Sequence, residues 1–545
     1  MENLVIKFAG DSGDGIQLIG TMFSNVVSKL GKQIFTFPSY PADMRAPKNS
    51  LQGVSSFQIK FGEEVNEPGD KCDILVCMNS SSYLANKNSV KEDGIVFIEQ
   101  LSAQDVVIMN KHLAIPFAAQ CDVFSRPKSR NMFVLGFIGY YLDINKEHFE
   151  QEIKKKFEKN EELCNINTRI LSKAYDLCEN NQIQKHPVVF DSEQQNKGEL
   201  MSGCSAACKG LIRAAKTVDK QLFLASYPIT PATDILIELE KARKQGVVAV
   251  QAEDEIAAAC MCIGAGFGGN IAVTSTSGPG LCLKSEAINL AVMAEIPMVI
   301  IDVQRGGPST GLPTKTEQSD LNIALYGRSG DSPIHVIAAN SPSDCFVKAY
   351  EAVKIAVEKK APVILLMDAY IGNGLQMCDT TQELPNIYPS KEWTVPGDEQ
   401  TKVLGGSEVD KKTLTITTDS ENHELNTSLR WRKVMLSDTP KMIFEGVGNK
   451  VLVGWGSTKG KIKEIQKRLL EKGHDFEITH IDYLSPLPTN VEELTHYDRV
   501  FVIEQNYGQL SNLLWQNGID TTTIEDLSGN QLDVEKIVEK IEAYL

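Results

Sequence analysis

Short apolar runs alternate with segments of helical periodicity between residues 222 and 371, and few folds accommodate that pattern. The apolar runs lie at residues 222–230, 247–253, 271–278, 297–306, 334–339 and 362–371. Most of the intervening segments repeat apolar residues at the three- and four-residue spacing of a helix. Strands that alternate with helices of this length favour a parallel sheet with helices on both faces. We therefore predict a doubly wound α/β fold for this part of the chain.

Two further α/β blocks flank this region, as expected for 545 residues, which exceed what one hydrophobic core usually supports. The first block covers residues 1–181, with strands predicted at 4–10, 72–78, 94–100 and 105–109. A Gln/Lys-rich linker at 182–198 precedes the middle block, residues 199–375. The pattern then fails over 376–440, which we predict as an irregular connection with one β-like run at 413–419. The third block covers 441–545.

The overall charge excludes some classes of function. The chain has 55 Lys and Arg against 71 Asp and Glu, a formal net charge of −16. A nucleic-acid surface would need a basic stripe to neutralise phosphates. No stretch approaches the roughly 18 consecutive apolar residues of a membrane helix, and the first residues lack the features of a secretory signal. We expect a cytoplasmic protein that binds neither nucleic acid nor a membrane.

The twelve cysteines are scattered and form no CxxC pair. Without clustered spacing they indicate neither a zinc site nor an iron–sulfur cluster on this chain. Cys204 and Cys208 are close enough in sequence to share a metal, but small buried side chains are the more common role of free cysteines. We predict no metal site.

A glycine-rich turn follows the first predicted strand, with Gly10, Gly13 and Gly15 leading into a helical segment. Backbone N–H groups at such a turn can hold a phosphate. The spacing differs from that of nicotinamide-binding folds, and the next strand, at residues 33–37, lacks the acidic residue that would bind a ribose. Two interpretations remain: a tight strand–helix turn, or a site for a nucleotide-like diphosphate such as that of coenzyme A.

Four polar motifs follow consecutive strands of the middle block. Ligands of open parallel sheets bind beyond the carboxyl ends of the strands. The first motif, at 227–231, presents the hydroxyl of Thr230 there, although Thr-Pro is also a common start of a helix. In the second, at 253–255, acidic residues open a helix of small residues; two of them suit the helix dipole. A third carboxylate entering a dry contact would bind a protonatable ring nitrogen.

The other two motifs lie on the next two strands. Arg305 ends a strand and begins a hydroxyl-rich loop that contains Thr314 and Lys315. A guanidinium at that position suits a carboxylate ligand, but a surface salt bridge would use the same residue type. Thr276 and Gly278 lie in another strand-to-helix turn at the same edge. Taken together, the four motifs predict one site.

The combined motifs resemble those of the 2-oxoacid:ferredoxin oxidoreductases, over nearly the whole chain. The middle block, with YPITP, the Glu253–Glu255 helix, TSTSGPG and QRGGPSTGLPTKTEQ, looks like the alpha portion of that family. The first block, with GDSGDG and FPSYPADMRAPKNSLQGVSSFQIK, is similar to its gamma domain. The third, with GWGSTKG, YLSPLP and EQNYGQL, resembles its transketolase carboxy-terminal-like domain. The resemblance thus implies a gamma-type α/β domain, a thiamine-diphosphate-binding pyrimidine domain and a transketolase-like α/β domain.

The resemblance also implies roles for particular residues. Glu255 would be the catalytic carboxylate that hydrogen-bonds the aminopyrimidine ring of thiamine diphosphate. Thr230, Arg305 and Thr314 would hold the 2-oxo-carboxylate of the substrate, and Lys315 is a candidate for a second carboxylate. The residues expected to bind the cofactors are Tyr227, Pro228, Ile229, Thr276 and Gly278, with Gly13 and Gly15 in the first block.

The family divides its work between subunits. The GDG and Asn-Asn motifs that bind magnesium diphosphate in thiamine enzymes do not occur here at a suitable spacing, because Asn180-Asn181 lies too far from Gly13–Gly15. The resemblance therefore implies a beta subunit that carries Mg²⁺, the diphosphate contacts and a [4Fe–4S] cluster. It also implies an αβ heterodimer or an α2β2 heterotetramer, with ferredoxin as electron acceptor and coenzyme A as co-substrate.

Several alternatives remain open at this stage. The favoured activity is decarboxylation of 2-oxoglutarate, which could run in reverse, but pyruvate or a broad set of 2-oxoacids would use the same motifs. A thiamine-dependent dehydrogenase or transketolase-like protein would lack both the gamma block and the loop around Arg305. A non-catalytic scaffold would have no need to retain four residues together: Thr230, Glu255, Arg305 and Thr314.

Overall fold

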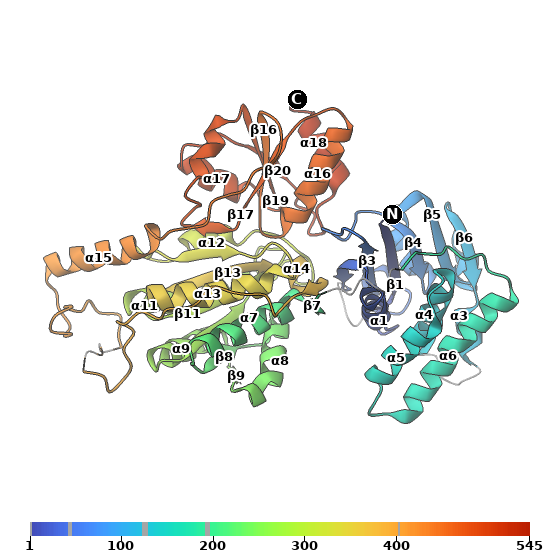
Figure 1. Cartoon of the computed structure of the whole chain (residues 1–545), viewed down its shortest axis with the longest axis horizontal. Helices are drawn as coiled ribbons and strands as arrows, with labels where there is room; N and C mark the ends of the chain where they lie inside the picture. The colour runs from blue at the N-terminus through green and yellow to red at the C-terminus, as the bar shows by residue number, and fades with distance from the viewer. Residues whose placement is uncertain (1–2, 42–45, 123–128, 191–196, 400, 402–403) are drawn as a thin grey trace. The chain divides into compact units, whose positions relative to one another are not determined.

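The computed structural model describes residues 3–41, 46–122, 129–190, 197–399, 401 and 404–545. Residues 42–45 of the gamma-like motif, 191–196 of the predicted linker, and 400 and 402–403 of the predicted connection lie outside the described residues. The chain forms two compact units (Figure 1). The first comprises Met1–Leu200 and Leu375–Met377, and the second Met201–Gly374 and Cys378–Leu545.

The first unit is built on an eight-stranded mixed sheet with the strand order β6-β5-β4-β1-β3-β2-β14-β7. Its strands are β1 (Leu4–Asp11), β2 (Gln33–Ser39), β3 (Val54–Gly62), β4 (Cys72–Cys77), β5 (Val90–Glu99), β6 (Lys111–Ile115), β7 (Glu199–Ser202) and β14 (Leu375–Cys378). Strand β1 pairs in parallel with β4 and antiparallel with β3, so that Ile6 lies between Ile74 and Ile59. All three isoleucines are buried, which places the centre of the sheet in the core.

Helices cover this sheet and close its core. They are α1 (Ile16–Lys29), α2 (Ser80–Asn86), α3 (Phe117–Asp122), α4 (Arg130–Tyr141), α5 (Lys146–Lys156) and α6 (Glu161–Asn180). Phe23 of α1 packs edge-to-face on Phe8 and Phe61 of the sheet, with ring centroids 5.8 Å apart in both pairs. Helix α4 approaches α6 closely, because a Cβ at Gly136 would lie only 2.6 Å from the carbonyl oxygen of Leu171.

The strand predicted at 105–109 is wrong. The structure has a short 3-10 helix at Ser102–Asp105, and the side chains of Val107 and Met109 are 83% and 86% exposed. The edge strand is β6, which starts at Lys111 and pairs in parallel with β5. An apolar run does not show by itself whether a neighbouring strand is free to pair with it.

The second unit contains the predicted doubly wound sheet, in the order β18-β12-β13-β11-β10-β8-β9. Its strands are β8 (Leu222–Ser226), β9 (Val248–Gln251), β10 (Ile271–Thr276), β11 (Met298–Gln304), β12 (His335–Ala338), β13 (Pro362–Asp368) and β18 (Tyr483–Ser485). All neighbours are parallel except β18, which runs antiparallel to β12. The parallel α/β fold predicted from the alternation is confirmed.

Helices follow or precede these strands along the chain, and most of them are labelled in Figure 1. They are α7 (Gly203–Thr217), α8 (Thr233–Lys241), α9 (Glu255–Phe267), α10 (Gly278–Leu283), α11 (Ser285–Met293), α12 (Leu321–Tyr326), α13 (Asp344–Lys359) and α14 (Ala369–Asn373). The side chain of Asp254 caps α9 by accepting a hydrogen bond from the amide of Ala257 at 2.8 Å. This cap starts the helix at Glu255.

A five-stranded sheet in the order β15-β17-β16-β19-β20 completes the second unit. Its strands and helices are β15 (Glu445–Gly446), β16 (Lys450–Trp455), β17 (Glu477–Ile481), β19 (Arg499–Glu504), β20 (Thr522–Glu525), α16 (Lys459–Glu471), α17 (Gln509–Gln516) and α18 (Val534–Glu542). Strand β18 leaves this block and joins the seven-stranded sheet. Buried Trp455 and Ile481 belong to the same hydrophobic cluster as Ile300 and Leu366, so one core runs through both sheets.

The connection predicted as irregular contains a helix, α15 (Ser420–Met435), which begins where the side chain of Asp419 accepts from the amide of Asn422. An isolated bridge joins Val409 to Ile416, and Ile416 lies in the β-like run predicted at 413–419. The helix escaped prediction because only three of its residues are buried, and polar residues dominate its sequence. No helix among the described residues is long and apolar enough to cross a membrane.

Candidate functional site

Thr230 and Arg305 meet at the carboxyl edge of the seven-stranded sheet. Arg305 follows β11 and is 7% exposed, and its guanidinium donates a hydrogen bond to the carbonyl oxygen of Thr230 at 2.6 Å. Thr233 forms the turn that starts α8, because its hydroxyl accepts from the amide of Ile229 at 2.9 Å. Thr230 is therefore not needed as the helix cap, and it is exposed. Its hydroxyl is available to a ligand beside the Arg305 guanidinium.

Glu255, Tyr227 and Thr276 come together at the ends of three neighbouring strands, β9, β8 and β10. The Tyr227 hydroxyl and Thr276 Oγ1 are hydrogen-bonded at 3.0 Å. A Cβ at Gly280 would overlap both of these oxygens and would lie 2.9 Å from Cγ of Glu255, so only glycine fits there. Burial raises the pKa of Tyr227, and the adjacent Glu255 carboxylate raises it further. Tyr227 thus acts as a neutral hydrogen-bonding group at neutral pH.

The loop after Arg305 folds back on itself. The amide of Leu312 donates to the carbonyl of Gly306 at 2.8 Å, and the amide of Gly306 donates to the carbonyl of Lys315 at 3.2 Å. This places Thr314 and Lys315 beside the start of the loop. The Lys315 ammonium donates to Asn530 Oδ1 at 3.1 Å, and burial lowers the pKa of this lysine.

A pair of carboxyl groups, Asp302 and Asp320, escaped the sequence analysis. Asp302 lies on β11, two residues before the end of the strand, and is 0% exposed; a Cβ at Gly278 would overlap the Asp320 carboxylate. Burial raises the pKa of Asp302 well above its usual value, and the charge of Asp320 adds to the shift. Burial likewise raises the pKa of Asp320, to about 6. The raised pKa favours the protonated form of Asp302, which pairs in register with Thr276 of the TSTSGPG motif.

Lys284 also escaped the sequence analysis, and it is 0% exposed. Its ammonium donates to the carbonyl oxygen of Glu255 at 3.0 Å and to Thr274 Oγ1 at 3.1 Å. It also lies 5.0 Å from the centre of the Tyr227 ring. Lys284 is the single basic residue of the helical segment at residues 281–295, and this was the signal that could have drawn attention to it.

Gly13 and Gly15 lie in the turn between β1 and α1 of the first unit, with φ angles of 98° and 76°. A Cβ at Gly15 would overlap Asn131, whereas one at Gly13 would meet nothing within 4 Å. The turn already contains a carboxylate, since Asp14 Oδ2 accepts from the amide of Asp11 at 2.8 Å. Backbone conformation explains the first glycine, and packing explains the second.

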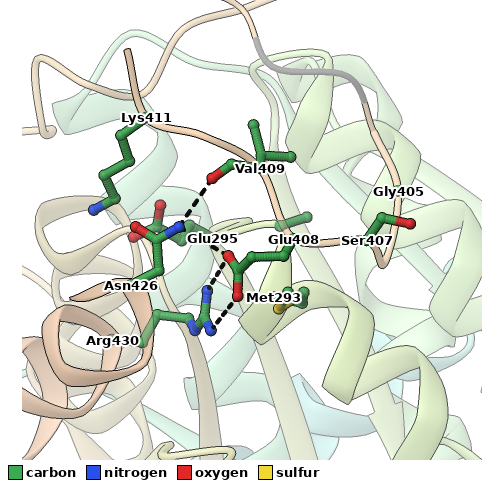
Figure 2. A pocket seen from close by; sticks show the side chains of 10 residues that line it. Met293, Glu295, Gly405, Ser407, Glu408, Val409, Lys411, Asn426 and Arg430 are labelled. Atoms are coloured by element: carbon green, nitrogen blue, oxygen red, sulfur yellow. Dashed lines mark hydrogen bonds and ion pairs between the residues drawn. The ribbon is translucent and has the colours of Figure 1, made fainter. Parts of the chain in front are cut away.

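Figure 2 shows a cavity that none of the predicted site residues lines. It lies between the end of α11, residues 405–411 and helix α15. Glu408 accepts hydrogen bonds there from His423 at 2.7 Å, Asn426 at 2.8 Å and Arg430 at 3.2 Å. These polar groups bond to one another, so the cluster holds the connecting segment against α15. Among the described residues, no three His, Cys, Asp or Glu side chains gather as a metal site.

Comparison with known proteins identifies two family models. Residues 214–420 match the model described as pyruvate flavodoxin/ferredoxin oxidoreductase, thiamine diP-bdg. Residues 5–177 match the model described as pyruvate ferredoxin/flavodoxin oxidoreductase. The first match contains Tyr227, Glu255, Arg305 and the motifs around them.

Relatives extend the similarity to the whole chain. The 2-oxoglutarate oxidoreductase subunit KorA of Mycobacterium tuberculosis is 36% identical over 600 aligned positions, covering 100% of this chain and 92% of that protein. The 2-oxoglutarate synthase subunit KorA of Archaeoglobus fulgidus is 34% identical and covers 64% of this chain and 99% of its own length.

Among solved structures, the 2-oxoglutarate:ferredoxin oxidoreductase of Magnetococcus marinus has a TM-score of 0.89 and 28% identity. The similarity covers 100% of this chain and 99% of that one, and that structure contains 2-oxoglutarate, coenzyme A and succinyl-CoA. From the full-length relative and both family models, we conclude that this chain belongs to the 2-oxoacid:ferredoxin oxidoreductase family and corresponds to its alpha subunit.

Proposed function

We propose that this chain, with its fused gamma domain, is the alpha subunit of an enzyme that converts 2-oxoglutarate and coenzyme A to succinyl-CoA. The reaction releases carbon dioxide, a proton and two electrons, and the electrons pass to ferredoxin. The observation that carries the proposal is the meeting of two groups at one sheet edge: the Arg305–Thr230 pair, and Glu255 with Tyr227 and Thr276. The activities named for the Mycobacterium and Magnetococcus relatives support this choice of substrate.

The residues around Glu255 fit one end of a thiamine cofactor. Because Gly280 has no side chain, the turn after β10 can lie against the Glu255 side chain, and the Tyr227 and Thr276 hydroxyls lie at the same point. A carboxylate at the start of α9 suits the protonated ring nitrogen of an aminopyrimidine. When bound, thiamine diphosphate supplies a nucleophilic carbon and an electron sink for decarboxylation. Glu255 would hold the proton at the ring, and Pro228, Ile229 and Gly278 would limit the access of water.

The substrate's carboxylate would bind to the Arg305 guanidinium and the hydroxyls of Thr230 and Thr314. Arg305 is suited to this task because a guanidinium offers donors on several edges. One of them already bonds to Thr230, which orients the group. Lys315 is the candidate partner for the distal carboxylate of 2-oxoglutarate, in exchange for its present partner, Asn530.

The remaining parts of the proposal concern the assembly. A beta subunit would supply Mg²⁺, the diphosphate contacts and the [4Fe–4S] cluster, in an αβ heterodimer or an α2β2 heterotetramer in the cytoplasm. Gly13 and Gly15 would lie near coenzyme A, in a gamma domain of residues 1–181. The linker 182–198, alpha domain 199–375, connection 376–440 and terminal domain 441–545 complete the proposed organisation.

The test uses this chain co-expressed with its beta subunit under anaerobic conditions. Coenzyme A-dependent reduction of ferredoxin is measured with 2-oxoglutarate, pyruvate and 2-oxobutyrate, for the wild type and for Glu255→Gln. Glu253→Gln is the matched control, because Glu253 is an exposed carboxylate of the same motif. We expect activity on 2-oxoglutarate that falls by about a hundredfold or more in Glu255→Gln and stays unchanged in the control.

A preference for pyruvate would keep the reaction class and correct the substrate. If an assembly that contains thiamine diphosphate and the cluster reduced ferredoxin with none of the three oxoacids, the proposed activity would be refuted.

A further inference from the structure

Lys284 is a fully buried lysine in contact with three of the four predicted site motifs. It follows α10, and its side chain is 0% exposed. A buried ammonium is costly unless its hydrogen bonds are satisfied. Neutral oxygens satisfy them here, namely the carbonyl of Glu255 and the hydroxyl of Thr274. Since a lysine is rarely buried without a purpose in packing or chemistry, its neighbours indicate what it does.

The groups that contact Lys284 belong to residues of the candidate site or lie close to them in sequence. The carbonyl that accepts from Lys284 belongs to Glu255 itself, so the ammonium holds the first residue of α9 in place. Thr274 lies on β10, two residues before Thr276, whose hydroxyl bonds to Tyr227. The ammonium also lies 5.0 Å from the centre of the Tyr227 ring, within the range of a cation–π contact.

Other titratable groups also face Lys284. From α9 these are the carboxylates of Asp254 and Glu255 and the thiols of Cys260 and Cys262. Burial lowers the pKa of Lys284 to about 8, although these groups act in the opposite direction. The ammonium therefore loses its proton in a range of pH that is accessible to binding experiments.

We propose that Lys284 is a positioning residue for Glu255: its ammonium joins the start of α9 to β10 and so fixes where the Glu255 carboxylate meets the cofactor. This inference rests on the proposed function, in which Glu255 binds the aminopyrimidine ring. Small displacements of a binding carboxylate weaken it strongly, because hydrogen bonds depend on distance and angle. The charged form of Lys284 holds the carbonyl more tightly than the neutral amine does.

The experiment measures binding of thiamine diphosphate by isothermal titration calorimetry. It uses the alpha–beta assembly after removal of the cofactor, with Mg²⁺ present, at several pH values from 7 to 9. The variants are Lys284→Met, which removes both hydrogen bonds and the charge, and Thr274→Val, which removes one acceptor and keeps the lysine. Lys348→Met is the matched control, because Lys348 is a buried lysine on α13 that pairs with Glu351.

We expect Lys284→Met to raise the Kd for thiamine diphosphate by about tenfold at pH 7, because the Glu255 carbonyl would lose the ammonium that holds it. The ratio of its Kd to that of the wild type should decrease as pH rises through 8, since the wild type then loses the same charge. A merely structural role would leave that ratio independent of pH. Thr274→Val should weaken binding less, and Lys348→Met should leave it unchanged.

Equal affinities of Lys284→Met and the wild type at every pH would overturn the inference. If Lys284→Met does not fold, as judged by circular dichroism, Thr274→Val provides the test. Wild-type affinity for thiamine diphosphate in that variant would refute the proposed link from α9 to β10 through Lys284. Glu255→Gln is titrated in parallel to separate the two proposals. Weaker binding in Glu255→Gln with wild-type binding in Lys284→Met removes only the role of Lys284. Wild-type binding in Glu255→Gln removes the proposed role of Glu255 and this inference with it.

Discussion

The guanidinium of Arg305 donates a hydrogen bond to the carbonyl oxygen of Thr230 across 2.6 Å, although 75 positions separate the two residues in sequence. Arg305 follows β11 and Thr230 follows β8, and β10 lies between these strands in the sheet. The hydrogen bond therefore spans the end of β10, where Thr276 lies beside Tyr227. This contact joins the proposed substrate-binding residues to the proposed cofactor-binding residues.

Replacing Arg305 by lysine tests this arrangement. Lysine keeps the charge but lacks the planar fork, so it cannot bond to Thr230 and to a substrate carboxylate in the same geometry. We expect Arg305→Lys to raise the KM for the 2-oxoacid by about tenfold or more, with a smaller effect on kcat. Steady-state kinetics of ferredoxin reduction measure both. Arg328→Lys is the control, since Arg328 bonds to backbone carbonyls of its own segment. Unchanged KM in Arg305→Lys would contradict the assignment.

Lys315 offers a test of substrate choice. Its ammonium bonds to Asn530 and lies one residue from Thr314. We expect Lys315→Met to raise the KM for 2-oxoglutarate by about tenfold, because the distal carboxylate would lose a cation. The KM for a monocarboxylic 2-oxoacid, measured on the same preparation, should stay unchanged. An equal loss for both substrates would assign Lys315 to the loop's structure instead.

Gly280→Ala tests the close packing around Glu255. The added Cβ would overlap Tyr227 Oη and Thr276 Oγ1, and forced overpacking of this kind costs about 1–3 kcal/mol. We expect weaker binding of thiamine diphosphate and a melting temperature that falls by a few degrees. Gly405→Ala is the control, since a Cβ there meets nothing within 4 Å. Wild-type affinity of Gly280→Ala for thiamine diphosphate would show that the turn can accommodate a Cβ at this position.

The raised pKa of Asp302 predicts a pH dependence of stability. The pKa of this carboxyl is raised above its usual value of 3.8, so the folded protein keeps a proton that the unfolded chain releases. The wild type therefore loses stability as pH rises above about 4, by up to about 1.4 kcal/mol per pH unit. Asparagine cannot lose that proton. We expect Asp302→Asn to gain stability relative to the wild type as the pH rises above about 4, measured by denaturant unfolding at several pH values. If the free energies of unfolding of Asp302→Asn and of the wild type changed equally with pH, Asp302 would be ionised in the folded protein.

The lowered pKa of Glu408 predicts a pH dependence of stability of the opposite sign, in another part of the second unit. Burial raises its pKa, but hydrogen bonds from Arg430, His423 and Asn426 outweigh burial and lower the pKa to about 2. The stability that Glu408 contributes is thus present above the unfolded value of 4.5 and is lost as pH falls toward 2.

Glu408→Gln should release the connecting segment at neutral pH, because Arg430 is only 10% exposed and would lose its charged partner. We expect local destabilisation of about 1–2 kcal/mol and faster limited proteolysis between residues 397 and 419. Glu424→Gln is the matched control, because Glu424 is an exposed carboxylate on α15, the helix that contains Arg430. Equal proteolysis of both variants would show that Glu408 does not hold the segment.

Local sequence patterns were sufficient to predict much of the second unit. The alternation between residues 222 and 371 predicted a parallel sheet, and all six of its parallel strands lie within the predicted runs. Strand ends of such a sheet share one edge, so the motif positions alone predicted that Thr230, Glu255, Thr276 and Arg305 would gather there. These predictions succeeded because they depend on local patterns. The periods of strands and helices, and the position where each strand ends, can be identified within short segments.

Contacts between distant segments could not be predicted in this way. Tyr483–Ser485 form β18 of the seven-stranded sheet because β12 has a free edge there, although the residues belong to the third block. In the sequence, Lys284 and Asp302 look like ordinary polar residues. Only the packing of α9, β10 and α12 around them excludes water from their side chains. Burial is a property of the assembled core, and it shifts the pKa values of these two side chains.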